Sequence, residues 1–129
     1  MNLKITDIRS CWEEVKPGLL AIAQKCAAEW RVEDVYARCL AGEWTLFMGP
    51  EVDGFLILSQ YSDRYRNEKR LVVECAYHDG ALDPFATYEP FLFATARQIG
   101  AVCIEFTSPR RGFEKKGWSV TDITYRKEV

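Results

Sequence analysis

Between residues 8 and 40, apolar residues recur every three or four positions. Residues three and four apart lie on the same side of an α-helix, so this spacing predicts amphipathic helices. We expect one helical pass over 8–16, ended by Pro17-Gly18, because this dipeptide interrupts regular structure. A second helix is expected over 19–30 and a third over 32–40. A short strand over 3–5 precedes them.

After residue 43 the pattern changes to short apolar runs rich in β-branched and aromatic residues, which are typical of strands. These runs cover 44–48, 55–61 and 70–77. The turn at 49–54 contains glycine and proline and is short enough to join the first two strands as an antiparallel hairpin. The polar loop at 62–69 is also short, so the third strand is expected to continue an antiparallel meander.

The last third of the chain predicts a crossover connection. Helical spacing resumes over 88–99, with Pro90 in the first turn of the helix, where its missing N–H costs little. A strand over 102–106 follows at once and is expected to run parallel to 70–77. A short helix within 108–116 and a last strand over 118–127 complete the chain.

Together these elements predict one α/β domain over residues 1–129, with a mixed sheet of the α+β type. The expected order is β-α-α-β-β-β-α-β-short α-β. A chain of 129 residues with 48% hydrophobic residues is long enough to bury its own core. No linker or repeat divides it.

Charge and composition exclude several classes of function. The net charge of −2 provides no basic field for nucleic acid. No apolar run reaches the roughly 20 residues that span a bilayer, and residues 1–10 lack the apolar core of a signal peptide. We therefore expect a cytoplasmic protein. The five cysteines show no CxxC spacing and are expected to be reduced and buried. A single histidine is too few for a typical metal site.

His78 is the only histidine and stands at the end of a predicted strand. Because the ordinary pKa of histidine lies near neutrality, this side chain could act as a general base for an amine or contact an anion. It could equally be a strand-end residue that hydrogen-bonds its own loop. The sequence leaves both interpretations open.

Two basic clusters and four tryptophans could form contacts with a partner. Basic clusters bind phosphates or acidic surfaces, but they are often simply solvated. Tryptophans are common both in cores and at binding hot spots, so a protein partner or a homo-oligomer stays open. The first cluster consists of Arg64, Arg66, Lys69 and Arg70, the second of Arg110, Arg111, Lys115 and Lys116, and the tryptophans are Trp12, Trp30, Trp44 and Trp118.

The order of elements, the segment Arg110-Arg111-Gly112-Phe113-Glu114-Lys115-Lys116-Gly117-Trp118 and the tail 122–129 resemble the GNAT superfamily of N-acetyltransferases. In that family a helix ending in a Lys-x-Gly-aromatic step precedes the last strands. The Arg-Arg-Gly-aromatic step is also similar to small GNAT-like proteins of tailed bacteriophages. This narrower resemblance implies a virion-associated or host-takeover role, in the host cytoplasm or the virion.

The segment 78–87 departs from the family's cofactor loop. GNAT enzymes hold the pyrophosphate of acetyl-CoA with a Gln/Arg-x-x-Gly-x-Gly/Ala loop, whose backbone N–H groups form an anion site. Here the segment has only one glycine, Gly80, together with Asp79, Asp83 and Pro84. The aspartates repel phosphate and the proline lacks an N–H donor. We therefore predict a divergent GNAT-like domain that lacks this loop, binds no cofactor and serves as a non-catalytic binding or virion-assembly protein.

The alternative that the resemblance implies is an acetyl-CoA-dependent N-acetyltransferase acting on an amine. Glu74 or His78 would then be the general base and Tyr125 the acid. Arg110 and Arg111, together with Gly80, would hold the phosphates in place of the missing loop.

Overall fold

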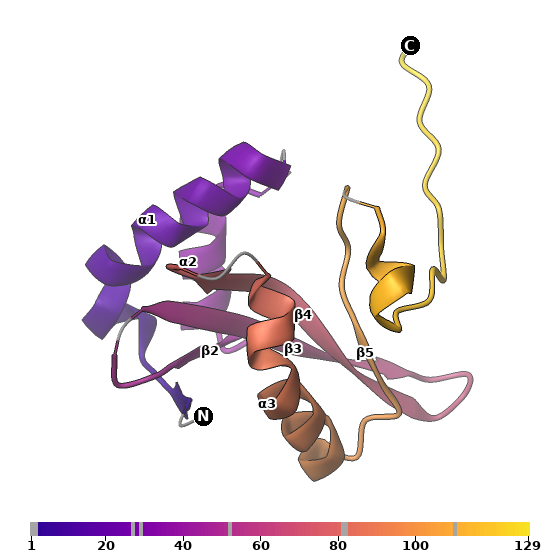
Figure 1. Ribbon diagram of the computed structural model, residues 1–129, viewed down its shortest axis with the longest axis horizontal. Helices are drawn as coiled ribbons and strands as arrows, with labels where there is room; N and C mark the ends of the chain where they lie inside the picture. The colour runs from indigo at the N-terminus through magenta and orange to yellow at the C-terminus, as the bar shows by residue number, and fades with distance from the viewer. Residues whose placement is uncertain (1–2, 27, 29, 52, 81–82, 110) are drawn as a thin grey trace.

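The computed structural model describes residues 3–26, 28, 30–51, 53–80, 83–109 and 111–129. A five-stranded mixed sheet forms its centre (Figure 1). The strands lie in chain order: β1 (Lys4–Ile5), β2 (Thr45–Met48), β3 (Gly54–Asp63), β4 (Glu68–His78) and β5 (Cys103–Glu105). The first four run antiparallel to their neighbours, and β5 runs parallel to β4. The predicted α+β class and the parallel crossover are confirmed.

Helices cover both faces of the sheet. The three α-helices are α1 (Ile8–Cys26), α2 (Val32–Leu40) and α3 (Pro84–Ile99), and a 3-10 helix, η1 (Phe113–Lys116), follows β5. Helices α1 and α2 lie on one face and α3 lies on the other (Figure 1). The chain is therefore a three-layer sandwich.

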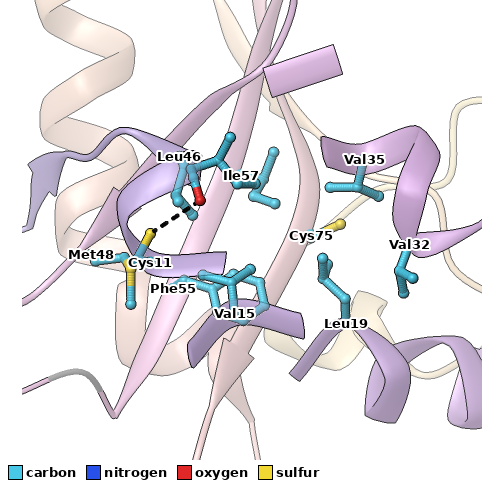
Figure 2. Close-up of a cluster of buried hydrophobic side chains, with 11 residues drawn as sticks. Cys11, Val15, Leu19, Val32, Val35, Leu46, Met48, Phe55, Ile57 and Cys75 are labelled. Carbon is cyan, nitrogen blue, oxygen red and sulfur yellow. Dashed lines mark hydrogen bonds between the residues drawn. The ribbon is translucent and has the colours of Figure 1, made fainter. Parts of the chain in front are cut away.

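Each face of the sheet has its own hydrophobic core. Figure 2 shows the core under α1 and α2, where Val15 and Leu19 from α1 pack with Phe55 and Ile57 from β3. The second core lies under α3 and is centred on Leu92. The four tryptophans are half-buried, and Trp12, Trp30 and Trp44 pack against the core under α1 and α2. Alternation of side chains along β3 supplies both cores, because successive residues of a strand point to opposite faces.

Helix α1 differs from its prediction. The sequence predicts a break at Pro17-Gly18, but the helix continues through both residues, and its irregular backbone lies at Cys11, with φ −134°. A Cβ atom on Gly18 would lie 2.6 Å from Cε1 of Phe55. Gly18 therefore permits the close approach of α1 to the sheet, and this packing outweighs the weak helix propensity of proline and glycine.

Helix α3 begins at Pro84 rather than at residue 88, and Pro90 lies inside it. Asp83 is the N-cap residue, and its carboxylate accepts a hydrogen bond of 3.2 Å from the backbone N–H of Ala86. The side-chain cap and the proline at the first position start the helix one turn earlier than apolar spacing indicates.

The predicted strand over 118–127 is wrong. No strand is present after β5 in the described chain, and residues 119–129 are exposed throughout. In Figure 1 this segment, drawn in yellow, ends away from the helices and strands. An extended sequence pattern forms a strand only where a neighbouring strand pairs with it.

The prediction of buried cysteines holds only in part. Cys11 and Cys75 are buried, Cys26 and Cys39 are half-buried, and Cys103 is exposed on β5. All five are free thiols.

Among the described helices, none combines the length and apolar character that crossing a bilayer requires.

Candidate functional site

A bulge in β4 lies at Glu74. The register of the β3–β4 ladder skips this residue, so Val73 packs in the core under α3 while Cys75 packs in the core under α1. Residues two apart on a regular strand share a face, and the extra residue reverses that rule. The Glu74 carboxylate is half-buried and accepts a hydrogen bond of 2.8 Å from the hydroxyl of Ser59.

The parallel ladder between β4 and β5 ends next to this bulge. It pairs residues 70–72 of β4 with residues 103–105 of β5. A bulge bends a strand and increases its twist, so β5 does not follow β4 further. Within the described residues, the β5-side edge of β4 therefore faces no strand from residue 73 to residue 78.

His78 lies at the end of this free edge, next to the carboxylate of Asp53, which was not among the predicted site residues. Its Nε2 atom is 3.3 Å from Oδ2 of Asp53, the residue that precedes β3. The two are neighbours because the hairpin register places Gly54 opposite His78. The other ring nitrogen, Nδ1, is buried and has no hydrogen-bond partner in the described part of the chain. The predicted antiparallel pairing of 55–61 with 70–77 could have indicated Asp53, because it places the start of the first of these strands beside the end of the second.

Tyr88 of α3 also packs at the end of β4, beside His78. Its hydroxyl donates a hydrogen bond of 3.1 Å to the carbonyl of Tyr77, and its ring centre is 5.9 Å from that of His78. Burial, with a smaller contribution from Asp53, raises the pKa of Tyr88 to about 12. Gly54 is required here, since a Cβ atom on it would lie 2.2 Å from the Tyr88 hydroxyl oxygen.

A pocket of about 160 Å³ opens at this end of the sheet, on the side of α1. Phe55 and Tyr77 form part of its wall, and their stacked rings have centres 5.6 Å apart. Three carboxylates also line it, from Glu14, Asp53 and Asp79. Aromatic faces and carboxylates together favour a cationic group such as an ammonium.

The N-terminus of α3 carries an anion that belongs to the chain itself. The Asp83 carboxylate, which caps the helix, also accepts a hydrogen bond from the ammonium of Lys116 in η1. The bond to Lys116 makes the largest contribution to lowering the pKa of Asp83, and the backbone N–H of Ala86 adds to it. Pro84, at the first position of the helix, has no N–H to offer.

Four aromatic rings hold η1 against the first turn of α3. The ring centres of Phe85 and Phe106 are 4.2 Å apart, and Phe113 and Trp118 meet Phe106 edge-on, each at 4.8 Å. We call these four residues the ring cluster. It fills the region where β5, η1 and the start of α3 meet, so η1 is fixed at the end of α3 that the GNAT resemblance assigns to the cofactor.

The structure brings together only some of the predicted site residues. Glu74 and His78 both lie on β4, and Gly80 follows with a φ of +114°, which favours glycine. Arg111 is exposed before η1, and Arg110 lies outside the described residues. Tyr125 is 88% exposed in the C-terminal segment and does not belong to the sheet.

Two residues of the first basic cluster are bound within the fold. Arg70 pairs with Asp63 at 3.3 Å and with Glu105 at 3.5 Å, and the ammonium of Lys69 donates a hydrogen bond to the carbonyl of Ile99.

Across the described residues, no three His, Cys, Asp or Glu side chains are grouped so that they could hold a metal ion.

Comparison with solved structures establishes the fold. No protein-family model matches the sequence, and no curated protein matches it. The chain superposes on a ribosomal-protein-alanine N-acetyltransferase from Brucella melitensis biovar Abortus 2308 with a TM-score of 0.69 and 14% identity, covering 99% of this chain and 98% of that one. This chain has a GNAT-like fold.

Two further GNAT-like structures agree. A putative acetyltransferase from Agrobacterium tumefaciens str. C58 gives a TM-score of 0.70 at 12% identity, with 100% of both chains covered. A putative acetyl transferase from Pyrococcus furiosus gives 0.67 at 13% identity, covering 99% of this chain and 100% of that one. At such identities the likeness establishes the GNAT-like fold alone, since one fold hosts many functions.

Proposed function

We propose that this chain is a non-catalytic binding protein built on the GNAT-like fold. The observation that carries the proposal is the Asp83 carboxylate at the N-terminus of α3, held there by Ala86 and Lys116. A helix N-terminus attracts an anion through its free N–H groups. Here the chain's own carboxylate already occupies that position.

The residues at this turn do not fit the pyrophosphate of acetyl-CoA. Pro84 supplies no donor, and the N–H of Ala86 is bonded to Asp83. Two like charges about 4 Å apart repel by about 4 kcal/mol at an effective dielectric constant near 20. A phosphate would therefore have to displace Asp83 from both of its partners before it could bind.

The ring cluster supports the same proposal. Because Phe106 and Phe113 pack on Phe85, the segment after β5 is held over the first turn of α3. A ligand lying along this turn would have to separate aromatic rings that are already in contact. A role in virion assembly, implied by the resemblance of residues 110–118, is one form that such a binding function would take.

Calorimetric titration with acetyl-CoA and with CoA tests the proposal. We expect no heat of binding from the natural chain up to millimolar ligand. Asp83→Ser keeps a capping hydroxyl and removes the charge, so it should bind CoA more tightly than the natural chain does. Glu114→Ser, at an exposed residue of η1, is the matched control for the loss of a surface carboxylate. Micromolar binding by the natural chain would refute the proposal.

A second candidate is an N-acetyltransferase acting on an amine, and the free edge of β4 beside His78 favours it. The pocket's carboxylates would attract an ammonium group. With Asp53 orienting the ring through Nε2, the nitrogen of His78 that could accept a proton is Nδ1, which is buried and has no hydrogen-bond partner among the described residues. Glu74 would be a less available base, because Ser59 already donates to it. Arg110, Arg111 and Gly80 would have to hold the phosphates, and Tyr125 would have to reach the site from the C-terminal segment.

Mass spectrometry of small amines incubated with acetyl-CoA and the purified chain tests this candidate. Acetylation that is lost in His78→Gln and retained in Tyr65→Phe, a change at an exposed loop, would establish it. If no amine gains an acetyl group at high protein concentration, the candidate fails and the binding proposal stands.

A further inference from the structure

The hairpin that joins β3 and β4 ends in an exposed aromatic residue between two arginines. Its turn, residues 64–67, reaches away from the three α-helices (Figure 1). The ring of Tyr65 is fully exposed, and Arg64 and Arg66 on either side of it are exposed as well. We call Arg64, Tyr65 and Arg66 the hairpin tip. Tyrosine and arginine are both enriched at binding hot spots, so this group has the composition of a binding surface.

The two guanidinium groups of the hairpin tip are available to a ligand. Neither has a hydrogen-bond or ion-pair partner among the described residues. The adjacent acid, Asp63, is already bound, because its carboxylate accepts hydrogen bonds from the Arg70 guanidinium at 3.3 Å and from the backbone N–H of Tyr65 at 2.9 Å. Residues 63–70 contain four basic and two acidic side chains, so this segment carries a charge of +2 in a chain whose net charge is −2. The positive charge is therefore local to the hairpin.

The backbone of the hairpin tip is ordered by the turn itself. The Asp63 carboxylate also accepts a hydrogen bond of 3.3 Å from the backbone N–H of Arg66. Asn67 follows with a φ of +53°, in the left-handed region that asparagine tolerates. Below the turn the β3–β4 ladder starts at the pair Asp63 and Glu68. A binding group on an ordered backbone loses less conformational entropy when its ligand binds.

We infer that the hairpin tip binds single-stranded nucleic acid. The ring of Tyr65 stacks on one base, and Arg64 and Arg66 bind the phosphates on either side of that base. Bases stack on exposed aromatic rings whatever their sequence, and guanidinium groups form strong, charge-assisted hydrogen bonds with phosphate. The other exposed ring of the hairpin, Tyr61, already has the Arg70 guanidinium 5.5 Å from its centre. Tyr65 is therefore the ring that remains free for a base.

The composition of the hairpin tip favours this ligand over a protein surface or a membrane. A specific protein interface buries about 800 Å² on each partner around an apolar centre, and insertion into a membrane surface needs an apolar face of several side chains. Within residues 62–68, Tyr65 is the one apolar or aromatic side chain. One ring between two cations matches one base between two phosphates. A duplex hides the faces of its bases, so the ligand is single-stranded.

The inference is separate from both candidate functions. The hairpin tip follows the Glu68 end of β4 in space, whereas His78 lies at the other end, about 30 Å away along the strand. Titration of Tyr65→Ala with CoA should therefore match titration of the natural chain. A failure of nucleic-acid binding would leave the proposed function as it stands.

Fluorescence anisotropy with a labelled oligothymidine of about twelve nucleotides tests the inference on the full chain. We expect a dissociation constant of about 10–100 µM near 50 mM salt, as for other sequence-independent contacts. Tyr65→Ala should raise this constant at least about fivefold, a loss typical of one stacked base. Tyr65→Phe should bind as the natural chain does, because phenylalanine keeps the ring. Binding that Tyr65→Ala leaves unchanged, or no change in anisotropy at a protein concentration tenfold above the expected range, would overturn the inference.

The salt dependence of binding counts the phosphate contacts. Two contacts to a single strand give a slope of about −1.4 for the logarithm of the association constant against that of the salt concentration, and one contact gives about −0.7. Arg64→Gln and Arg66→Gln should each bring the slope to the second value. Arg31→Gln is the matched control, because it removes an exposed guanidinium at the start of α2. A change of slope in Arg31→Gln as large as in Arg66→Gln would overturn the inference.

Two further probes separate nucleic acid from the other partners. Polyglutamate carries the same sign of charge without bases, and phosphatidylserine vesicles present an anionic membrane. We expect both to bind more weakly than oligothymidine and to be insensitive to Tyr65→Ala. Tighter binding of either probe, lost in Tyr65→Ala, would show that the hairpin tip recognises an acidic protein segment or a membrane, and would overturn the inference.

Discussion

The ammonium of Lys116 donates a hydrogen bond to the carboxylate of Asp83, thirty-three residues earlier in the chain. This contact joins η1 to the first turn of α3, where Asp83 also caps the helix. The ring cluster packs beside it, so a polar and an apolar contact hold the same two elements together. The Asp83 carboxylate is thus held at the N-terminus of α3 by a contact with η1, and not only by residues of its own turn.

Loss of Lys116 should make the stability of the protein less dependent on acid pH. The folded pKa of Asp83 is lowered, so its stabilising contribution is present above its unfolded value near 3.8 and is lost as pH falls through the lower folded value. Lys116→Met should therefore reduce the free energy of unfolding at pH 7 by up to about 1 kcal/mol, because the lysine is half exposed, and by less at pH 3. Urea denaturation at both pH values measures this. Equal losses at pH 7 and pH 3 would contradict it, and Lys115→Met is the control.

Tyr88→Phe should remove an alkaline transition. The raised pKa of Tyr88 means that its neutral form stabilises the fold fully below the unfolded pKa near 10, and that this stability is lost as pH rises toward about 12. At pH 8 the variant should lose about 1 kcal/mol with the hydrogen bond to Tyr77, and between pH 10 and 12 it should lose less than the natural chain does. Thermal unfolding across this range gives the comparison. Tyr65→Phe, at a fully exposed ring, should leave the profile unchanged.

Gly18→Ala should destabilise the protein although alanine is the better helix former. The new Cβ atom would lie 2.6 Å from Phe55 and 2.9 Å from Tyr77, both of which are packed rings. We expect a loss of about 1–3 kcal/mol, against a gain of about 1 kcal/mol from propensity alone. Gly49→Ala is the control, since its nearest contact would be an ordinary 3.6 Å from Leu3. Chemical denaturation showing a more stable Gly18→Ala variant would mean that α1 does not approach the sheet this closely.

The rings of Phe85 and Phe106 should be energetically coupled. They stack with centres 4.2 Å apart, and such pairs contribute about 0.5–1.5 kcal/mol beyond their buried area. A double-mutant cycle with leucine at each position should recover a coupling in this range. The cycle for Phe85 and Phe55, which lie on opposite faces of the sheet, should be additive. Additivity in the first cycle would indicate that the ring cluster does not form.

The candidate site could be predicted only in part. The residues at 78–87 predict a turn that departs from the family's cofactor loop, and the structure adds that the carboxylate of Asp83, bonded to Lys116, lies at the N-terminus of α3. Asp53 was not predicted, and Lys116 was named only as part of a basic cluster that could contact a partner, because the role of each depends on a residue distant in the chain. Glu74 was selected for its charge, whereas its structural role is the bulge, which depends on the register between two strands.

By itself, the sequence determined the helices and strands wherever local spacing carries the signal: α2, the hairpin of β3 and β4, and the parallel β5 after α3. Periodicity of apolar residues decides these elements because each exposes one face to a core. Only the tertiary structure decided that α1 continues through Pro17-Gly18 and that residues 119–129 form no strand. For α1 the deciding contact lies far away in the chain, a ring of β3 against Gly18, and for residues 119–129 no described strand lies beside them to pair with. The start of α3 at Pro84, by contrast, is set by the local cap of Asp83 and by the proline itself.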